Sequence, residues 1–74
     1  MLHLYSRANC HLCDEMADAL SEFGVEFEKV DVDGDPALSA RFGRSVPVLT
    51  DGAGREICRI HLDAQALRAR LALE

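Results

Sequence analysis

The feature that most constrains the fold of this chain is the motif Cys10-His11-Leu12-Cys13, which follows a short apolar segment and opens an amphipathic helical pattern. Two cysteines at this spacing on the first turn of a helix can close a disulfide with little backbone movement. The free N–H groups and the dipole at a helix start also favour the thiolate form of a cysteine there. The motif therefore predicts a redox-active dithiol at the start of a helix.

The dithiol must be built within 74 residues, which we take as one domain, 1–74, with a single small core. Apolar residues make up 49% of the chain and charged residues 28%, so the chain is not disordered. A net charge of −5 and scattered basic residues exclude a nucleic-acid partner. We find no run of membrane-spanning length and no signal peptide, so we expect a cytoplasmic, monomeric protein without membrane contact.

Hydrophobic periodicity predicts strands and helices in the order βαβαββα. The strands are predicted at residues 2–5, 25–32, 45–50 and 56–60, the last two joined by a turn at 51–54. The helices are predicted to begin at caps Asn9, Asp35 and Asp63, and Gly24 and Gly43 end the first two. In the first helix Cys13 shares a stripe with the apolar residues Met16, Ala17 and Leu20, so Cys13 faces inward and Cys10 lies at the exposed tip.

This order, with the cysteine pair opening the first helix and Val46-Pro47 opening the third strand, resembles a glutaredoxin. The segment before Cys10 is similar to the glutaredoxin segment in which a basic residue, here Arg7, precedes the first cysteine by three positions, and Ser45-Val46-Pro47 is similar to Thr-Val-Pro. The resemblance implies an α/β thioredoxin fold of minimal glutaredoxin type, in which a four-stranded mixed sheet is flanked by three helices. It also implies a cis Pro47 opposite the dithiol, with Val46 offering backbone hydrogen bonds to substrate.

The activity that the resemblance implies is dithiol–disulfide oxidoreduction with Cys10 as the attacking thiol and Cys13 as the resolving thiol. The substrates would be disulfides of proteins or small molecules. No cofactor would be bound, and the reductant would be glutathione or a thioredoxin-reductase-like flavoenzyme. Six residues are candidates for substrate contact, although Arg7 and His11 could equally be solvated surface groups: Arg7, His11, Leu12, Val46, Pro47 and Asp63.

The chain departs from glutaredoxins at two places. His11-Leu12 stands between the cysteines where those enzymes usually have Pro-Tyr, and no Gly-Gly follows the fourth strand, where Ile60 and His61 stand instead. Because glycine permits the close backbone approach that glutathione needs there, we expect weak glutathione binding. In both respects the chain resembles the small glutaredoxin-like proteins of bacteria more than a glutathione-dependent enzyme.

Other interpretations of the same residues remain open. The domain could be a non-catalytic thioredoxin-fold binding module, or Cys10, Cys13, Cys58 and His61 could hold zinc. A long intervening segment separates the two halves of that set, so we expect no metal site. Cys58 is most simply a small buried apolar residue, although a third redox thiol is possible. The run Asp31, Asp33 and Asp35 imitates a calcium loop, but Pro36 and Phe42 occupy the essential glycine and glutamate positions.

Overall fold

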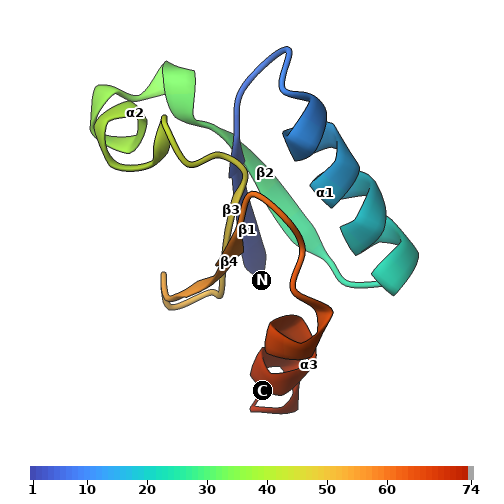
Figure 1. The fold of residues 1–74 in the computed structure, drawn as a ribbon. Coiled ribbons are helices and arrows are strands. Elements are labelled where there is room, and N and C mark those ends of the chain that lie inside the picture. The colour runs from blue at the N-terminus through green and yellow to red at the C-terminus, as the bar shows by residue number, and fades with distance from the viewer. Residues whose placement is uncertain (74) are drawn as a thin grey trace.

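The structure, a computed structural model, describes residues 1–73 (Figure 1). Glu74, the last residue of the predicted domain, lies outside the described residues. The elements in chain order are β1 (Leu2–Ser6), α1 (His11–Phe23), β2 (Phe27–Asp31), the short 3-10 helix η1 (Val32–Gly34), α2 (Pro36–Phe42), β3 (Val48–Thr50), β4 (Glu56–Arg59) and α3 (Ala64–Ala72). The predicted order βαβαββα is confirmed. None of these helices combines the length and the apolar character needed to cross a membrane.

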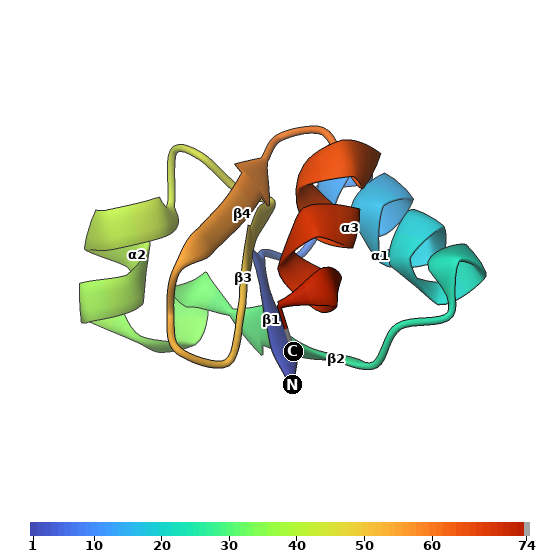
Figure 2. The same ribbon diagram turned by 90° about the horizontal axis from the view of Figure 1, so that it is seen from below.

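The strands form one mixed sheet in the order β2-β1-β3-β4. β1 is parallel to β2 and antiparallel to β3, and β3 is antiparallel to β4. Figure 2 shows α2 on one face of this sheet and both α1 and α3 on the other. The expected four-stranded mixed sheet flanked by three helices is therefore confirmed.

The core has one part on each face of the sheet, because successive side chains of a strand point to opposite faces. Leu49 belongs to the cluster under α1 and α3, while its neighbour Val48 belongs to the cluster under α2. The first cluster also contains Leu2, Leu4, Met16, Leu20, Cys58 and Leu67, and the second contains Val32 and Phe42. The ring of Tyr5 stacks on Phe42 with centroids 4.5 Å apart, which fastens α2 to β1.

The start of α1 differs from the sequence prediction. Its N-cap is Cys10, with φ −111° and ψ 104°, and not Asn9. Asn9 instead has φ 58°, a left-handed conformation that asparagine tolerates better than most residues. Asn9 therefore turns the chain into the helix, and the cysteine takes the capping position. The other end is as predicted, since Gly24 closes α1 with φ 82°.

Several strand ends also differ from prediction by a few residues. β2 begins at Phe27 because the N–H of Val25 is still bonded to the carbonyl of Leu20, at the end of α1. Val32 leaves the strand and is buried in η1. β3 begins only after Pro47, which has no N–H for the ladder. β4 ends at Arg59 because Ile60 has φ 68°.

Candidate functional site

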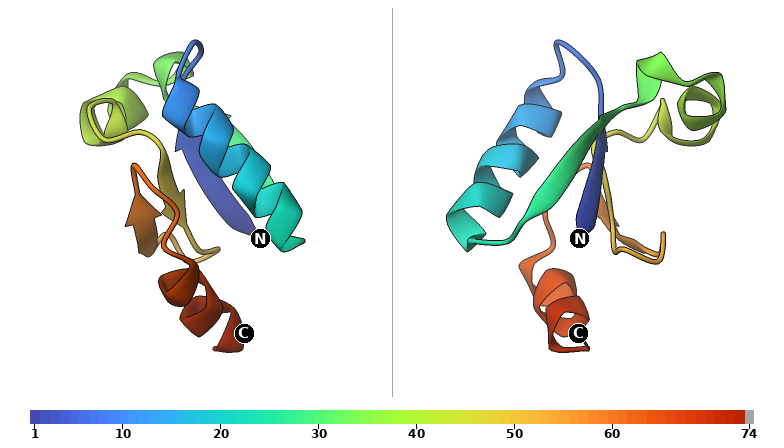
Figure 3. Two further views of the ribbon diagram at one scale, coloured as in Figure 1. Left: turned by 45° about the vertical axis from the view of Figure 1, so that its right-hand side comes forward. Right: turned by 180° about the vertical axis from the view of Figure 1, so that it is seen from behind.

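The topology gathers three segments at one end of the sheet. Because β3 runs antiparallel to β1 and β4, the start of β3 lies beside the ends of the other two strands. The end of β2 lies there as well, because β2 is parallel to β1. The three segments are the loop from β1 to Cys10, the segment with Val46 and Pro47, and the loop 60–63 from β4 to α3 (Figure 3). All of the predicted site residues lie on these segments or on the first turn of α1.

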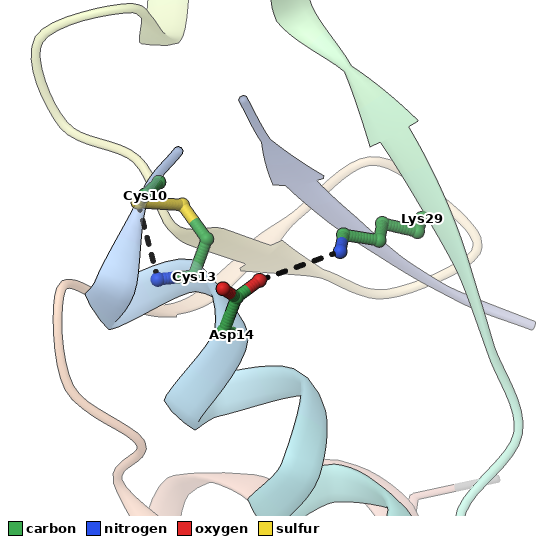
Figure 4. Close-up of a disulfide and its surroundings, with 4 residues drawn as sticks. All are labelled: Cys10, Cys13, Asp14 and Lys29. Atoms are coloured by element: carbon green, nitrogen blue, oxygen red, sulfur yellow. Dashed lines mark hydrogen bonds and ion pairs between the residues drawn. A yellow bond between two sulfur atoms is a disulfide. The ribbon is translucent and has the colours of Figure 1, made fainter. Parts of the chain in front are cut away.

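Cys10 and Cys13 form a disulfide with their Cα atoms 5.2 Å apart. Cys13 is fully buried, as its place in the apolar stripe predicts, whereas Cys10 is half-buried. The Sγ atom of Cys10 accepts a hydrogen bond of 3.1 Å from the backbone N–H of Cys13 (Figure 4). When the disulfide is reduced, a thiolate at this capping position has the same N–H group and the helix dipole to stabilise it.

Pro47 follows Val46 through a cis peptide bond and is fully buried. Its carbonyl accepts a hydrogen bond of 2.8 Å from the N–H of Ile60, which fastens the segment before β3 to the loop after β4. Val46 is half-buried and packs on the cluster under α2. The backbone before β3 is therefore held by contacts with both the loop after β4 and the cluster under α2.

Arg7 is directed toward η1. Its Nη2 atom lies 3.1 Å from Oδ1 of Asp33, and its side chain is 36% exposed. The Nε atom of Arg7 is buried and has no hydrogen-bond partner among the described residues. Arg7 also lines a pocket of about 290 Å³ with Ser6, Ala8, Lys29 and Asp31. Its charge is balanced by Asp33, so the arginine joins the end of β1 to η1.

The other predicted contact residues have different surroundings. The side chain of His11 is 86% exposed, and its Nε2 atom lies 3.3 Å from Oε1 of Glu15, an ion pair only when the histidine is protonated. Leu12 is half-buried and lines a groove described below. Asp63 is the N-cap of α3, as predicted, and its Oδ1 atom accepts a hydrogen bond of 3.0 Å from the N–H of Ala66.

A groove lies between α1 and the loop after β4, with a volume of about 280 Å³. We call it the side groove and define it by its lining residues: Leu12, Glu15, Met16 and Ala19 of α1, and Ile60, His61 and Leu62 of the loop. Five of these residues are apolar. The sequence does not predict this groove, because its two walls are far apart in the chain.

Cys58 lies in β4 and is buried in the core, apart from the disulfide. Burial raises the pKa of its thiol, against the opposing effect of a hydrogen bond with the backbone of Asp63. Within residues 1–73, no group of three or more histidine, cysteine, aspartate or glutamate side chains converges as a metal site would require. Cys58 and His61 therefore do not complete a cluster with the cysteine pair.

The acidic run that begins with the last residue of β2 has a structural partner for each of its carboxylates. Asp31 caps η1, accepting the N–H of Asp33, and Asp35 caps α2, accepting the N–H of Ala37. The Asp33 carboxylate pairs with Arg7. These three side chains are exposed, as expected for a solvated turn.

Two features of the site have no clear sequence signal. Ile60 has φ 68°, a left-handed conformation that β-branched residues rarely adopt, so sequence patterns give no reason to expect it there. Lys29 of β2 and Asp14 of α1 point toward one another beside the disulfide (Figure 4), with Nζ and Oδ1 3.8 Å apart. This pair joins two elements whose relative placement only the fold determines.

Comparison with known proteins agrees with this architecture. A buckwheat glutaredoxin, solved as a complex with glutathione, has the same fold, with a TM-score of 0.63 at 19% identity over 96% of this chain and 67% of that one. The fold of this chain is therefore the thioredoxin-like α/β fold. Residues 1–72 match the family described as Glutaredoxin-like domain (DUF836), and the chain belongs to that family.

Two relatives are closer in sequence. The protein XcR50 from X. campestris, with a known X-ray structure, is 43% identical and has a TM-score of 0.82, and the match covers 100% of this chain and 99% of that one. The uncharacterized protein Mb0520 from Mycobacterium bovis is 37% identical over 81 residues, which cover 96% of this chain and 81% of that protein. The similarity thus extends over nearly the whole chain.

Proposed function

We propose that this protein is a dithiol–disulfide oxidoreductase that reduces disulfides of proteins or small molecules. The observation that supports this most directly is the Cys10–Cys13 disulfide, which joins a half-buried cysteine at a helix N-cap to a fully buried one. Thiol–disulfide exchange requires one accessible thiolate and one partner thiol within reach. The glutaredoxin-like family and fold are consistent with this chemistry.

The reaction begins with the reduced protein. The Cys10 thiolate attacks one sulfur of the substrate disulfide, a mixed disulfide forms, and the other substrate sulfur leaves as a thiolate that takes up a proton. Cys13, deprotonated, then attacks the Cys10 sulfur and releases the second substrate thiol. Two electrons pass from the protein dithiol to the substrate, and the protein is left with the observed Cys10–Cys13 bond.

The remaining residues supply binding and orientation in this proposal. Leu12 and the backbone of Val46 contact the substrate beside the attacked disulfide, and Pro47 keeps that backbone in place. Arg7, His11 and Asp63 offer polar groups for contact with the substrate. Glutathione or a thioredoxin-reductase-like flavoenzyme regenerates the dithiol, which suits a reducing compartment such as the cytoplasm.

Trapping experiments with single cysteine variants test the proposal. After exposure to a model disulfide, Cys13→Ser should accumulate a stable adduct on Cys10, because the resolving thiol is missing. The matched variant Cys10→Ser should form no adduct on Cys13. Mass spectrometry with peptide mapping locates the adduct. Adducts chiefly on Cys58 in both variants would show that the exchange chemistry does not belong to the Cys10–Cys13 pair.

A further inference from the structure

We propose that the side groove binds an apolar side chain of a protein substrate, with a basic residue of the same substrate against the neighbouring acidic surface of α1. This inference rests on the proposed function and names the class of disulfide that the site prefers. The occupant is therefore a protein segment in which the reacting cysteine is followed closely by an apolar and a basic residue. The size, position and charge of the groove each support this occupant.

The lining of the groove suits one apolar side chain. Met16 is 2% exposed and forms a buried floor, while Leu12, Ala19, Ile60 and Leu62 are half-buried around it. The volume of about 280 Å³ lies below the range of about 300–1,000 Å³ that is usual for pockets of drug-sized ligands. A single large side chain fits such a space better than an extended small molecule.

The groove begins beside the dithiol. Leu12 lies between the two cysteines in the chain and is also part of the groove wall. A peptide whose cysteine is bonded to Cys10 therefore has its neighbouring residues close to the groove. Since an extended chain advances about 3.3 Å per residue, the side chain that enters the groove is within a few positions of the substrate cysteine.

The charge beside the groove favours a basic residue. Glu15 is on the rim with its side chain 58% exposed. Asp18 and Glu22 follow it at helical spacing on α1, and both are exposed. α1 contains no lysine or arginine, and Arg68 of α3 lies over the ring of Phe23 at the opposite end of the helix. An acidic stripe thus runs along α1 from Glu15 at the rim of the apolar groove.

Other charged groups near the start of α1 already have partners. Lys29 lies 3.8 Å from Asp14, and His11 lies 3.3 Å from Glu15. His11 is 86% exposed, so a lysine or arginine of a substrate can replace it at Glu15 without disturbing packed residues. Asp14 does not line the groove. It provides a charge-matched control for Glu15.

Synthetic peptide disulfides test this proposal with the Cys13→Ser protein. Three peptides carry the same activated cysteine followed by Leu-Lys, Leu-Glu or Gly-Lys, and the rate of adduct formation on Cys10 is measured. We expect Leu-Lys to react about tenfold faster than Gly-Lys, the effect of one apolar side chain in a fitting pocket. We expect Leu-Lys to react about two- to fivefold faster than Leu-Glu. This difference in rate should disappear at high salt, because salt screens an exposed charge pair.

Variants assign these preferences to the groove. Ala19→Leu fills it and should remove the preference for leucine, while Glu15→Gln should reduce the preference for lysine and the control Asp14→Asn should leave it unchanged. Each rate is divided by the rate of the same variant with a small neutral disulfide, so that any effect of the substitution on the thiol itself cancels. Equal rates for the three peptides, or a leucine preference that survives Ala19→Leu, would overturn the proposal.

A second measurement separates docking from redox chemistry. Peptides with serine in place of cysteine are titrated into the oxidised wild-type protein, and amide shifts are followed by NMR. Shifts at Leu12, Ala19 and Leu62 with the Leu-Lys peptide support docking. If Cys10 is nevertheless unreactive with every disulfide, that result contradicts the proposed function and leaves the docking proposal standing. Shifts absent with all peptides refute docking. Self-association abolished by Ala19→Leu would show that a second copy occupies the groove instead, and would also refute it.

Discussion

At the scale of single residues, the two bonded cysteines differ in their access to solvent. Cys10 is half-buried at the N-cap of α1 and accepts the N–H of Cys13, whereas Cys13 is fully buried. Thiolate reactivity depends on both electrostatic stabilisation and exposure. The structure therefore supports an assignment of roles in which Cys10 reacts with external disulfides and Cys13 reacts only with Cys10.

We predict that Cys10 in the Cys13→Ser variant is alkylated at pH 7 about tenfold or more faster than Cys13 in Cys10→Ser, because exposure and the helix start both favour attack at Cys10. Timed iodoacetamide labelling followed by peptide mapping measures both rates. Cys58 provides an internal control in each sample, since burial raises the pKa of its thiol and should keep it unmodified in the folded protein. Similar rates for Cys10 and Cys13 would contradict the assignment of roles.

Part of this residue-level arrangement could be predicted from the sequence. The i, i+3, i+4 spacing that includes Cys13, Met16 and Ala17 identifies Cys13 as the inward cysteine, since helical periodicity is a local property. The N-cap of α1 could not be predicted from local preferences in the same way. Asn9 and Cys10 are adjacent, and residue preferences favour asparagine as the cap, but the chain uses asparagine for the left-handed turn that leads into the helix.

At the scale of elements, α2 and α3 both begin with an aspartate as N-cap. Asp35 accepts the N–H of Ala37 at 2.9 Å, and Asp63 accepts the N–H of Ala66 at 3.0 Å. Both carboxylates are exposed. They therefore form a natural pair for separating a structural role from a role in binding, because Asp63 begins a helix on the same face of the sheet as α1, whereas Asp35 begins a helix on the opposite face.

We predict that Asp35→Ala and Asp63→Ala each lower the free energy of unfolding by about 1 kcal/mol, the usual contribution of an N-cap. Urea denaturation measures this loss. The rate of adduct formation in the Cys13→Ser background should fall only with Asp63→Ala if Asp63 also contacts the substrate. Equal rates in the two variants would leave Asp63 with a capping role alone.

The turn between β3 and β4 depends on a buried carboxylate. Asp51 is 5% exposed, its Oδ1 atom accepts the N–H groups of Ala53 and Arg55 at 2.9 Å each, and its Oδ2 atom pairs with Arg70 of α3. The backbone N–H of Arg55, with further hydrogen bonds from Arg70 and Ala53, holds the pKa of Asp51 below its ordinary value of 3.8. Asp51 thus ties the hairpin to the last helix.

Because Asp51 joins the hairpin to α3, the free energy of unfolding should depend on pH. Because folding lowers the pKa of Asp51, its ionised form contributes fully above pH 3.8, and the contribution is lost as the pH falls through the folded-state pKa. Asp51→Asn should therefore be less stable than wild type near pH 7, and the gap in urea midpoint should narrow below pH 4. The exposed control Asp18→Asn should differ little from wild type throughout. A gap for Asp51→Asn that stays constant from pH 7 to pH 3 would contradict this explanation.

Element order was predictable because each helix and strand carries its own periodicity and end signals. Pro36 follows the cap Asp35, and Gly24 ends α1, so these boundaries are local and agree with the structure. The ends of β2 were not predictable in the same way. Val25 and Val32 have high strand propensity, but tertiary hydrogen bonding and burial place one in a helix cap and the other in η1.

At the scale of the whole molecule, the fold assembles the site from segments that are distant in the chain. Val46-Pro47 lies more than thirty positions after Cys13, yet the antiparallel placement of β3 against β1 brings both segments to one end of the sheet. The motifs themselves are readable from the sequence. The side groove and the left-handed Ile60 are not, because they depend on how the loop after β4 packs against α1 and Pro47.

That loop leads to a prediction about glutathione. The resemblance to glutaredoxins leads us to expect two glycines in this loop, but the chain has Ile60 and His61 there. The N–H of Ile60 is bonded to the carbonyl of Pro47, and His61 is exposed. Their side chains occupy the surface where glycine would allow close approach of a ligand to the backbone. We predict that turnover with glutathione and its reductase is at least about tenfold lower than that of an ordinary glutaredoxin, which corresponds to about 1.4 kcal/mol of lost binding.

The rate of exchange with a dithiol reductant should not be lowered in this way, because a dithiol needs no binding site for a tripeptide. Oxidation and reduction of Cys10–Cys13 by dithiothreitol therefore serve as the control, and they should proceed equally in wild type and in a double variant Ile60→Gly/His61→Gly. Only glutathione turnover should rise in the double variant, since glycine at Ile60 also adopts φ 68° without strain. Wild-type turnover equal to that of a glutaredoxin measured side by side would refute this prediction. In that case Arg7, Val46 and Asp63 would be sufficient to hold the tripeptide without the two glycines.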